Sequence, residues 1–262
     1  MGRLKDASGR WLERDKERVT CLVSVVFGGL GEVGDEGGDI VGYGVCPISP
    51  EEIELSVGRA LKKTKNRSAA GPDGIRYRLI KVVLDTHLGH ELVEEMVYNL
   101  TQGVIPTAWR EMRVVFIPKL GRDLTLAKNW RPLNHINCVW KLGEKVVVDR
   151  IQDFGGDLFH RLQFGSVRGQ SAVEILYQSV IRARECINEG GSVGWGFWDV
   201  KGGFQNVVGE KVLDDLVGVE GIRGLCEWVK QWVAGRTFEV FWDRKVRGVG
   251  TSSKGVPPGC PL

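Results

Sequence analysis

The residue best placed to do chemistry is Asp199, an acidic side chain that closes an apolar run and precedes the pair Gly202–Gly203. The run Val193–Val200 predicts a buried strand. A strand end holds a carboxylate in a fixed position that solvent still reaches, which suits a divalent metal ion. An isolated aspartate at such a place more commonly caps a turn. Phe204 follows the glycines, so the turn brings an aromatic ring near the carboxylate.

The composition is that of a soluble globular protein. The chain has 262 residues, of which 42% are hydrophobic and 26% charged, and these values exclude disordered, collagen-like and coiled-coil proteins. The six cysteines are far apart, form no CxxC pair and have no histidine at metal-ligand spacing, so we expect free thiols in an intracellular protein. No apolar run approaches the ~18–20 residues of a membrane span, and no membrane partner is expected.

Positive charge is concentrated between Arg59 and Lys81. This stretch holds eight basic residues against Asp73 alone, although the net charge of the whole chain is only +3. A local excess of this kind attracts polyanions. A solvated, lysine-rich helix face explains the same pattern equally well.

Periodicity and turn chemistry predict a mixture of helices and strands. Ser49 is a helix cap followed by proline and two acids, and it predicts a helix to about Lys63. The composition of Ala70–Ile75 indicates a turn. Further helices are expected over 77–100, 139–152, 171–189, 207–216 and 221–234, with a strand over 113–118 and a hairpin of 237–242 with 245–249. Without regular βαβ alternation, the pattern favours the α+β class.

Five segments, in order along the chain, resemble the motifs of reverse transcriptases from non-LTR (LINE-like) retrotransposons. They are Ser68–Ile75, Val115–Lys119 with Asn129–Asn134, Gln163–Ser171, Asp199–Phe204 and Gly255–Leu262. The resemblance runs from about residue 49 to the last residue. It implies an α+β right-hand polymerase fold that is incomplete, with an extension over 1–45, fingers over 46–192 and part of the palm over 193–262.

The resemblance also implies the reaction and its participants. The family copies an RNA template onto a DNA primer from deoxynucleoside triphosphates, and two ions of Mg²⁺ (or Mn²⁺) stabilise the attacking and leaving oxygens. Nuclear action follows from a LINE-like ancestry, and a mitochondrial intron-encoded relative is the alternative.

The same resemblance assigns roles to individual residues. Asp199 and the carbonyl of Val200 would bind metal, and Lys119 and Arg131 would bind the triphosphate. Phe204 would exclude a 2′-hydroxyl by steric clash. Gly259 would lie against the nascent base pair. The residues expected to contact nucleic acid are Lys62, Lys63, Lys65, Arg67, Arg76, Arg78 and Arg168.

The chain departs from the family pattern in several places. Gln205 follows the aromatic where an acid is common, and Pro258 and Cys260 stand where glutamine and serine are usual. The aromatic-Ala-Asp-Asp motif that follows Gly255–Leu262 in the family is not in the sequence. We therefore expect a reverse transcriptase fragment that does not polymerise alone. The alternatives are an RNA-binding remnant without catalysis, or a pseudogene product without function.

Overall fold

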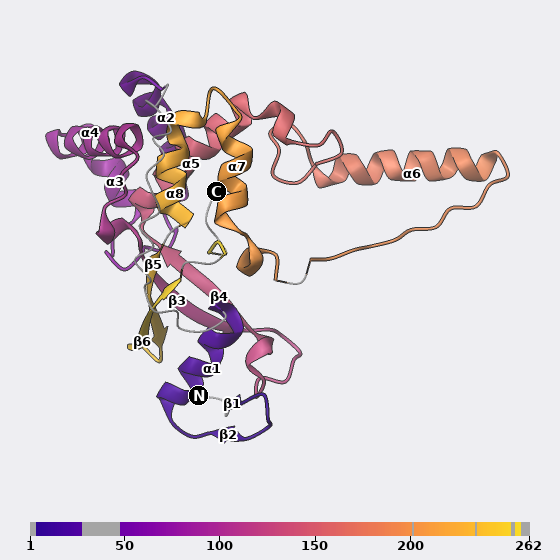
Figure 1. The fold of residues 1–262 in the computed structure, drawn as a ribbon, viewed down its shortest axis with the longest axis horizontal. Helices are drawn as coiled ribbons and strands as arrows, with labels where there is room; N and C mark the ends of the chain where they lie inside the picture. The colour runs from indigo at the N-terminus through magenta and orange to yellow at the C-terminus, as the bar shows by residue number, and fades with distance from the viewer. Residues whose placement is uncertain (1–3, 28–47, 201, 234, 253–254, 258–262) are drawn as a thin grey trace.

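The computed structural model describes residues 4–27, 48–200, 202–233, 235–252 and 255–257, and these residues form a mixed helical and stranded molecule. Figure 1 shows one group of helices at one end of a central sheet and the N-terminal elements at the other end. This mixture of helices and strands is compatible with the predicted α+β class. None of the described helices combines the length and the apolar character that crossing a membrane requires.

Eight α-helices and six strands make up the regular structure of the described residues. The helices are α1 (Asp15–Phe27), α2 (Pro50–Lys63), α3 (Tyr77–Val83), α4 (His87–Gln102), α5 (Cys138–Phe154), α6 (Ala172–Asn188), α7 (Gly209–Val217) and α8 (Cys226–Val233). The strands are β1 (Leu4–Lys5), β2 (Trp11–Leu12), β3 (Glu111–Pro118), β4 (Trp130–Ile136), β5 (Arg236–Trp242) and β6 (Lys245–Ser252).

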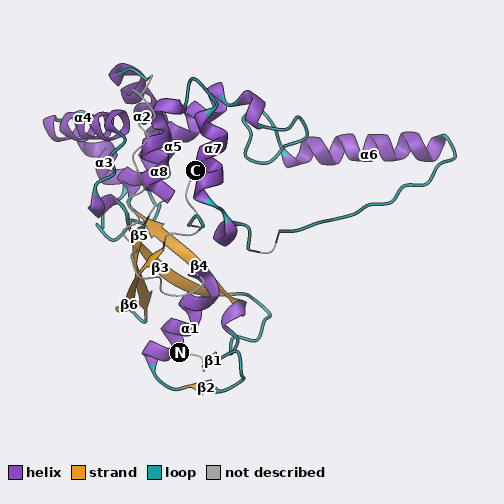
Figure 2. Ribbon diagram, viewed as in Figure 1, coloured by secondary structure: helices purple, strands orange, loops and turns teal. Residues whose placement is uncertain are grey.

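The central sheet has the strand order β4-β3-β5-β6 (Figure 2). The two outer pairs are antiparallel, whereas β3 and β5 are parallel, with Glu111 opposite Thr237. The predicted hairpin of β5 and β6 is confirmed. Its turn places Asp243 and Arg244 at φ values of 55° and 61°, the geometry of a two-residue turn that follows strand twist. One face buries Val114 and other apolar residues.

The helical core is built around a buried carboxyl group. Glu144 of α5 is fully buried, and its Oε1 accepts hydrogen bonds of 2.6 Å from the indole N–H groups of Trp140 and Trp232. Trp232 belongs to α8, so the carboxyl joins two helices. Burial raises the pKa of Glu144 to about 7, because a charge in an apolar interior lacks solvation.

The predicted helix at Ser49 is confirmed together with its cap. The Ser49 hydroxyl accepts from the Glu52 amide at 3.2 Å, and the Glu52 carboxylate accepts from the Ser49 amide at 3.0 Å. This reciprocal pair satisfies two amides that the first helical turn leaves free.

The predicted turn at Gly71–Gly74 packs against the junction of β4 and α5. The Gly74 amide donates to the Gly71 carbonyl at 3.1 Å. A Cβ on Gly71 would lie 2.0 Å from Oδ1 of Asn137, and Asn137 donates to the Ala108 carbonyl at 2.8 Å. Only glycine lets the two backbones approach this closely.

The single helix expected over 77–100 is instead divided into α3 and α4, because Thr86 adopts an extended conformation and its hydroxyl donates to the Val83 carbonyl. Two regions have elements that the sequence did not predict. Trp130–Ile136 pairs with β3 as β4, and residues 4–27 of the extension form β1, β2 and α1.

The strand predicted over Val193–Val200 is wrong. Residues 191–200 have no regular structure and are exposed, with Phe197 at 86% and Trp198 at 97%. Figure 1 shows this segment returning from the far end of α6, which projects away from the other helices and has no buried residue. A strand needs a neighbour to pair its backbone groups, and no described strand lies beside this run.

We expect Gly71→Ala to destabilise the fold by about 1–3 kcal/mol, the usual effect of forcing extra atoms into a packed contact. Gly58→Ala is the matched control, because a Cβ at Gly58 in α2 meets nothing within 4 Å. This control should be neutral or stabilising by up to about 1 kcal/mol. Urea unfolding of both variants measures the difference. Equal stability of the two would show that the turn does not pack on Asn137.

We expect Glu144→Gln to remove a pH dependence of stability. The folded chain keeps a proton on Glu144 up to a pKa of about 7, whereas the unfolded chain loses it near 4.5. The free energy of unfolding should therefore fall by roughly 3 kcal/mol as the pH rises from about 4.5 to about 7. Urea unfolding of wild type and variant at each pH tests this, and parallel curves would contradict a raised pKa.

Candidate functional site

The structure brings together two motifs that lie about 50 residues apart. The Val256 amide donates to the Phe204 carbonyl at 2.8 Å, and the Gly255 amide donates to the Val207 carbonyl at 3.2 Å. The Phe204 side chain remains 56% exposed. The expected sugar-selecting aromatic therefore lies beside the expected nucleotide-gripping segment, with its ring open to solvent.

Arg236, which the sequence reasoning missed, ties this pair to the core. Arg236 is only 3% exposed. Its guanidinium donates to the Gly255 carbonyl at 2.5 Å and to the Trp232 carbonyl at 2.9 Å. The guanidinium also lies 5.4 Å from the centre of the Trp232 ring. Contacts thus run without a break from Glu144 through Trp232 and Arg236 to Gly255.

A signal for Arg236 is present in the sequence. Arg236 lies on the same face of β5 as Phe238 and Val240, both of which are buried. An arginine on the inward side of a strand needs acceptors for its guanidinium. Carbonyl groups of an adjoining loop are suitable acceptors.

Lys119 and Arg131 lie at the same end of the β3–β4 pair. Arg131 is opposite Ile117 in the register, and the Lys119 amide donates to the Asn129 carbonyl at 2.9 Å. The Lys119 ammonium donates to the Lys128 carbonyl at 2.6 Å, and the Arg131 side chain is exposed. Two basic residues therefore lie at the same end of the β3–β4 pair.

Asp199 and Val200 lie in the exposed segment after α6. Within the described parts of the chain, no three His, Cys, Asp or Glu side chains gather in a way that could hold a metal ion. The described residues therefore do not by themselves fit a two-metal centre, which needs several carboxylates. The assignment of Asp199 to metal binding stays a prediction.

The basic residues predicted to contact nucleic acid fall into two groups. Those at the end of α2 and the start of α3 are all exposed, and they are Lys62, Lys63, Lys65, Arg67, Arg76 and Arg78. Arg168 instead forms ion pairs with Asp149, at 3.0 Å, and with Asp153. These carboxylates compete with any phosphate for its guanidinium. Gly259 lies outside the described residues.

Comparisons with known proteins agree with the motifs. A retrovirus-related Pol polyprotein from the type-1 retrotransposable element R2 of Popillia japonica is 31% identical over 106 residues, which is 40% of this chain. The RNA-directed DNA polymerase from the mobile element jockey of Drosophila melanogaster is 25% identical over 82% of this chain. A 149 kDa protein of transposon TX1 from Xenopus laevis is 23% identical over 82%.

These relatives are proteins of non-LTR retrotransposons, so the resemblance that the motifs predicted is confirmed. The chain spans between 13% and 24% of the length of the three relatives. No protein-family model matches it.

We expect Arg236→Met to loosen the Gly255–Val256 segment. A hydrogen bond to a charged group contributes about 1.5–3 kcal/mol, so exchange of the Gly255 and Val256 amides should accelerate by about tenfold or more. Hydrogen exchange with mass spectrometry measures this, with peptides of α5 reporting global stability. Arg236→Lys should lie between wild type and Arg236→Met.

The control for this experiment is Arg113→Met, since Arg113 lies on the same sheet but pairs with Glu239. If Arg113→Met accelerated these two amides as much as Arg236→Met, the guanidinium would not be their specific restraint.

Proposed function

We propose that this chain forms the fingers and the first part of the palm of an RNA-directed DNA polymerase from a non-LTR retrotransposon. The observation that carries the proposal is the pair of backbone hydrogen bonds from Gly255–Val256 to Val207 and Phe204. They join two motifs whose shared task in such an enzyme is to bind the incoming nucleotide. The ordered motifs and the similarity to the jockey polymerase support the same assignment.

In this proposal the incoming nucleotide is held by groups on three elements. Lys119 and Arg131 contact its phosphates, one as a point charge and one as a bidentate fork. Phe204 lies under the sugar and disfavours a 2′-hydroxyl by contact. Arg236 keeps the backbone of Gly255 in place through its hydrogen bond. Pre-organised groups of this kind bind without first paying for their own ordering.

In this proposal the chain supplies only part of a magnesium site. Asp199 supplies one carboxylate, and a complete centre requires further carboxylates beside it. The exposed position of the 191–200 segment leaves Asp199 accessible from several sides.

The partners in this proposal are an RNA template, a DNA primer and deoxynucleoside triphosphates. Six exposed basic side chains between Lys62 and Arg78 supply the charge that template phosphates require. The same observation favours a second candidate function, which is RNA binding without catalysis. Only the first function includes DNA synthesis, whereas both predict that RNA binding weakens as the salt concentration rises.

We expect Asp199→Asn to reduce primer extension to background while leaving RNA affinity within about twofold, because one carboxylate is lost outside the basic stretch. Extension of a primed RNA with magnesium would be measured on the longest protein that the gene encodes. Asp214→Asn is the matched control, since Asp214 is exposed on α7. Equal activity of wild type and Asp199→Asn would remove Asp199 from the mechanism. Salt-dependent RNA binding by a wild type without synthesis would favour the second candidate.

A further inference from the structure

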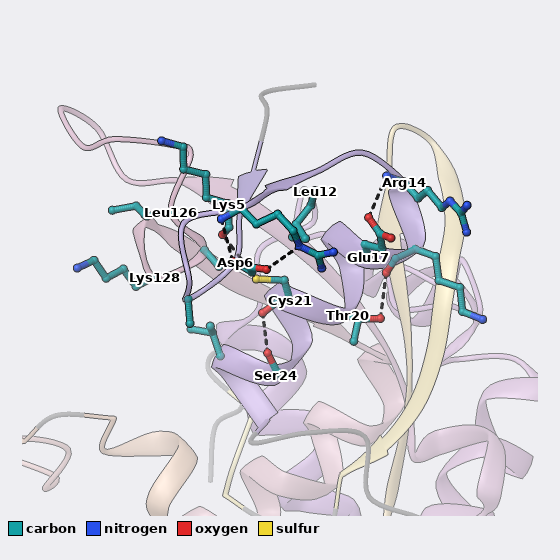
Figure 3. A pocket seen from close by; sticks show the side chains of 15 residues that line it. Lys5, Asp6, Leu12, Arg14, Glu17, Thr20, Cys21, Ser24, Leu126 and Lys128 are labelled. Atoms are coloured by element: carbon teal, nitrogen blue, oxygen red, sulfur yellow. Dashed lines mark hydrogen bonds and ion pairs between the residues drawn. The ribbon is translucent and has the colours of Figure 1, made fainter.

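A cavity of about 800 Å³ lies between the N-terminal elements and the turn that precedes β4 (Figure 3). The Lys5 amide donates to the Thr125 carbonyl at 2.7 Å, and Lys5 pairs with Leu126 as an isolated bridge. Helix α1 packs against the same turn. The β1–β2 hairpin, helix α1 and this turn therefore form three walls of the cavity. The turn lies in the loop between Lys119 and Asn129, which joins two parts of a polymerase motif, and the other lining residues lie outside the motifs.

Positive charge dominates the lining of this cavity. Five cationic side chains line it, namely Lys5, Arg10, Arg14, Lys16 and Lys128, against the two acids Asp6 and Glu17. Asp6 accepts from the Ser8 hydroxyl at 2.6 Å and from Nε of Arg10 at 3.1 Å. These hydrogen bonds lower the pKa of Asp6 to about 2, so Asp6 is ionised and neutralises Arg10 locally.

Three of the cations have no such partner. Glu17 accepts from the backbone amide of Arg14 at 3.4 Å, and no hydrogen bond or ion pair within the described residues engages the side-chain charges of Arg14, Lys16 or Lys128. In Figure 3, Arg14 and Lys128 lie on opposite sides of the cavity. Three of the cations that line the cavity therefore remain available to an anionic ligand.

Apolar side chains also line the cavity. They are Leu12, Val25, Leu126 and Ala127, together with Cys21. A lining that combines apolar and cationic side chains fits a ligand with a flat, weakly polar body and negative charges. A nucleotide has this chemistry, with a base for the apolar side chains and phosphate oxygens for the cations.

The loop that lines the cavity is also bonded to the proposed nucleotide site of the fingers. The Lys128 carbonyl accepts from the Lys119 ammonium at 2.6 Å, so the side chain expected to bind a triphosphate contacts the backbone of a residue that lines the cavity.

We propose that this cavity binds a segment of single-stranded nucleic acid, with phosphates on Arg14, Lys16 and Lys128 and a base against the apolar side chains that line it. The inference rests on the proposed function for the identity of the polyanion and adds to it a binding site outside the recognised motifs. It gives residues 4–27 a role in holding the strand.

The first test measures the affinity of the 262-residue chain for a fluorescein-labelled 12-nucleotide single-stranded RNA across a salt series. The combined Arg14→Ala, Lys16→Ala and Lys128→Ala variant should bind about tenfold more weakly at ~0.1 M salt. Its slope of log affinity against log salt should be shallower by about 2, because each phosphate contact on a single strand contributes about 0.7. The matched control replaces Lys211, Lys245 and Arg184, which are exposed elsewhere, and should bind within about twofold of wild type. Equal loss in both variants would overturn the proposal.

The second test uses Cys21 as a reporter inside the cavity. Burial raises the pKa of its thiol, so alkylation by a maleimide is slow and easily followed by peptide mass mapping. Bound RNA should protect Cys21 by about fivefold or more, and the triple variant should lose this protection. A glutamate peptide of equal charge that protected equally would overturn the assignment to nucleic acid. Protection by a deoxynucleoside triphosphate without protection by RNA would overturn the assignment to a strand.

These outcomes are separate from those of the proposed function. Loss of primer extension on Asp199→Asn reports on synthesis, whereas Cys21 protection reports on binding at the N-terminal cavity. A chain that never extends a primer and still shows RNA protection of Cys21 would sustain this inference and count against catalysis.

Discussion

The carboxyl of Glu144, held between two indole groups, is the interaction on which the arrangement of the helical core and the candidate site depends. A buried acid without partners destabilises a fold, and one that is hydrogen-bonded fixes its neighbours in one geometry. Here the neighbours are Trp140 on its own helix and Trp232 on α8. Because Arg236 is anchored on the Trp232 carbonyl, the position of α8 sets the position of Gly255. A polar contact in the helical core therefore determines the backbone geometry of the Gly255–Val256 segment.

Sequence reasoning worked where short-range chemistry decides the structure. The cap at Ser49, the turn at Gly71–Gly74 and the hairpin at Asp243–Arg244 each depend on residues within a few positions of one another, and all three are confirmed. The strand Trp130–Ile136 was missed because its inward positions include Asn134. The polar sequence hides a strand whose pairing with β3 compensates for weak local preference.

In the candidate site, too, short-range features were predictable and long-range contacts were not. The resemblance assigned Phe204 and the motif Gly255–Leu262 to the bound nucleotide, and hydrogen bonds join Gly255 and Val256 to Val207 and Phe204. Arg236 and Glu144 were not expected, since their importance comes from contacts between residues 19 and 88 positions apart. The prediction of a strand before Asp199 was wrong because it relied on composition alone. The apolar composition of that segment is correct for a strand, but pairing partners and not composition decide whether such a run becomes one.

The parallel pairing of β3 with β5 has a consequence for how the chain is made. Partners such as Glu111 and Thr237 are separated by 126 positions. At ~5–20 residues per second, a ribosome needs roughly 6–25 s to deliver the second strand after the first. During that interval the β3–β4 ribbon has an unoccupied edge, which is a template for pairing with other chains. Shielding by a chaperone, or pausing of translation before β3, would lower the fraction of newborn chains lost to aggregation.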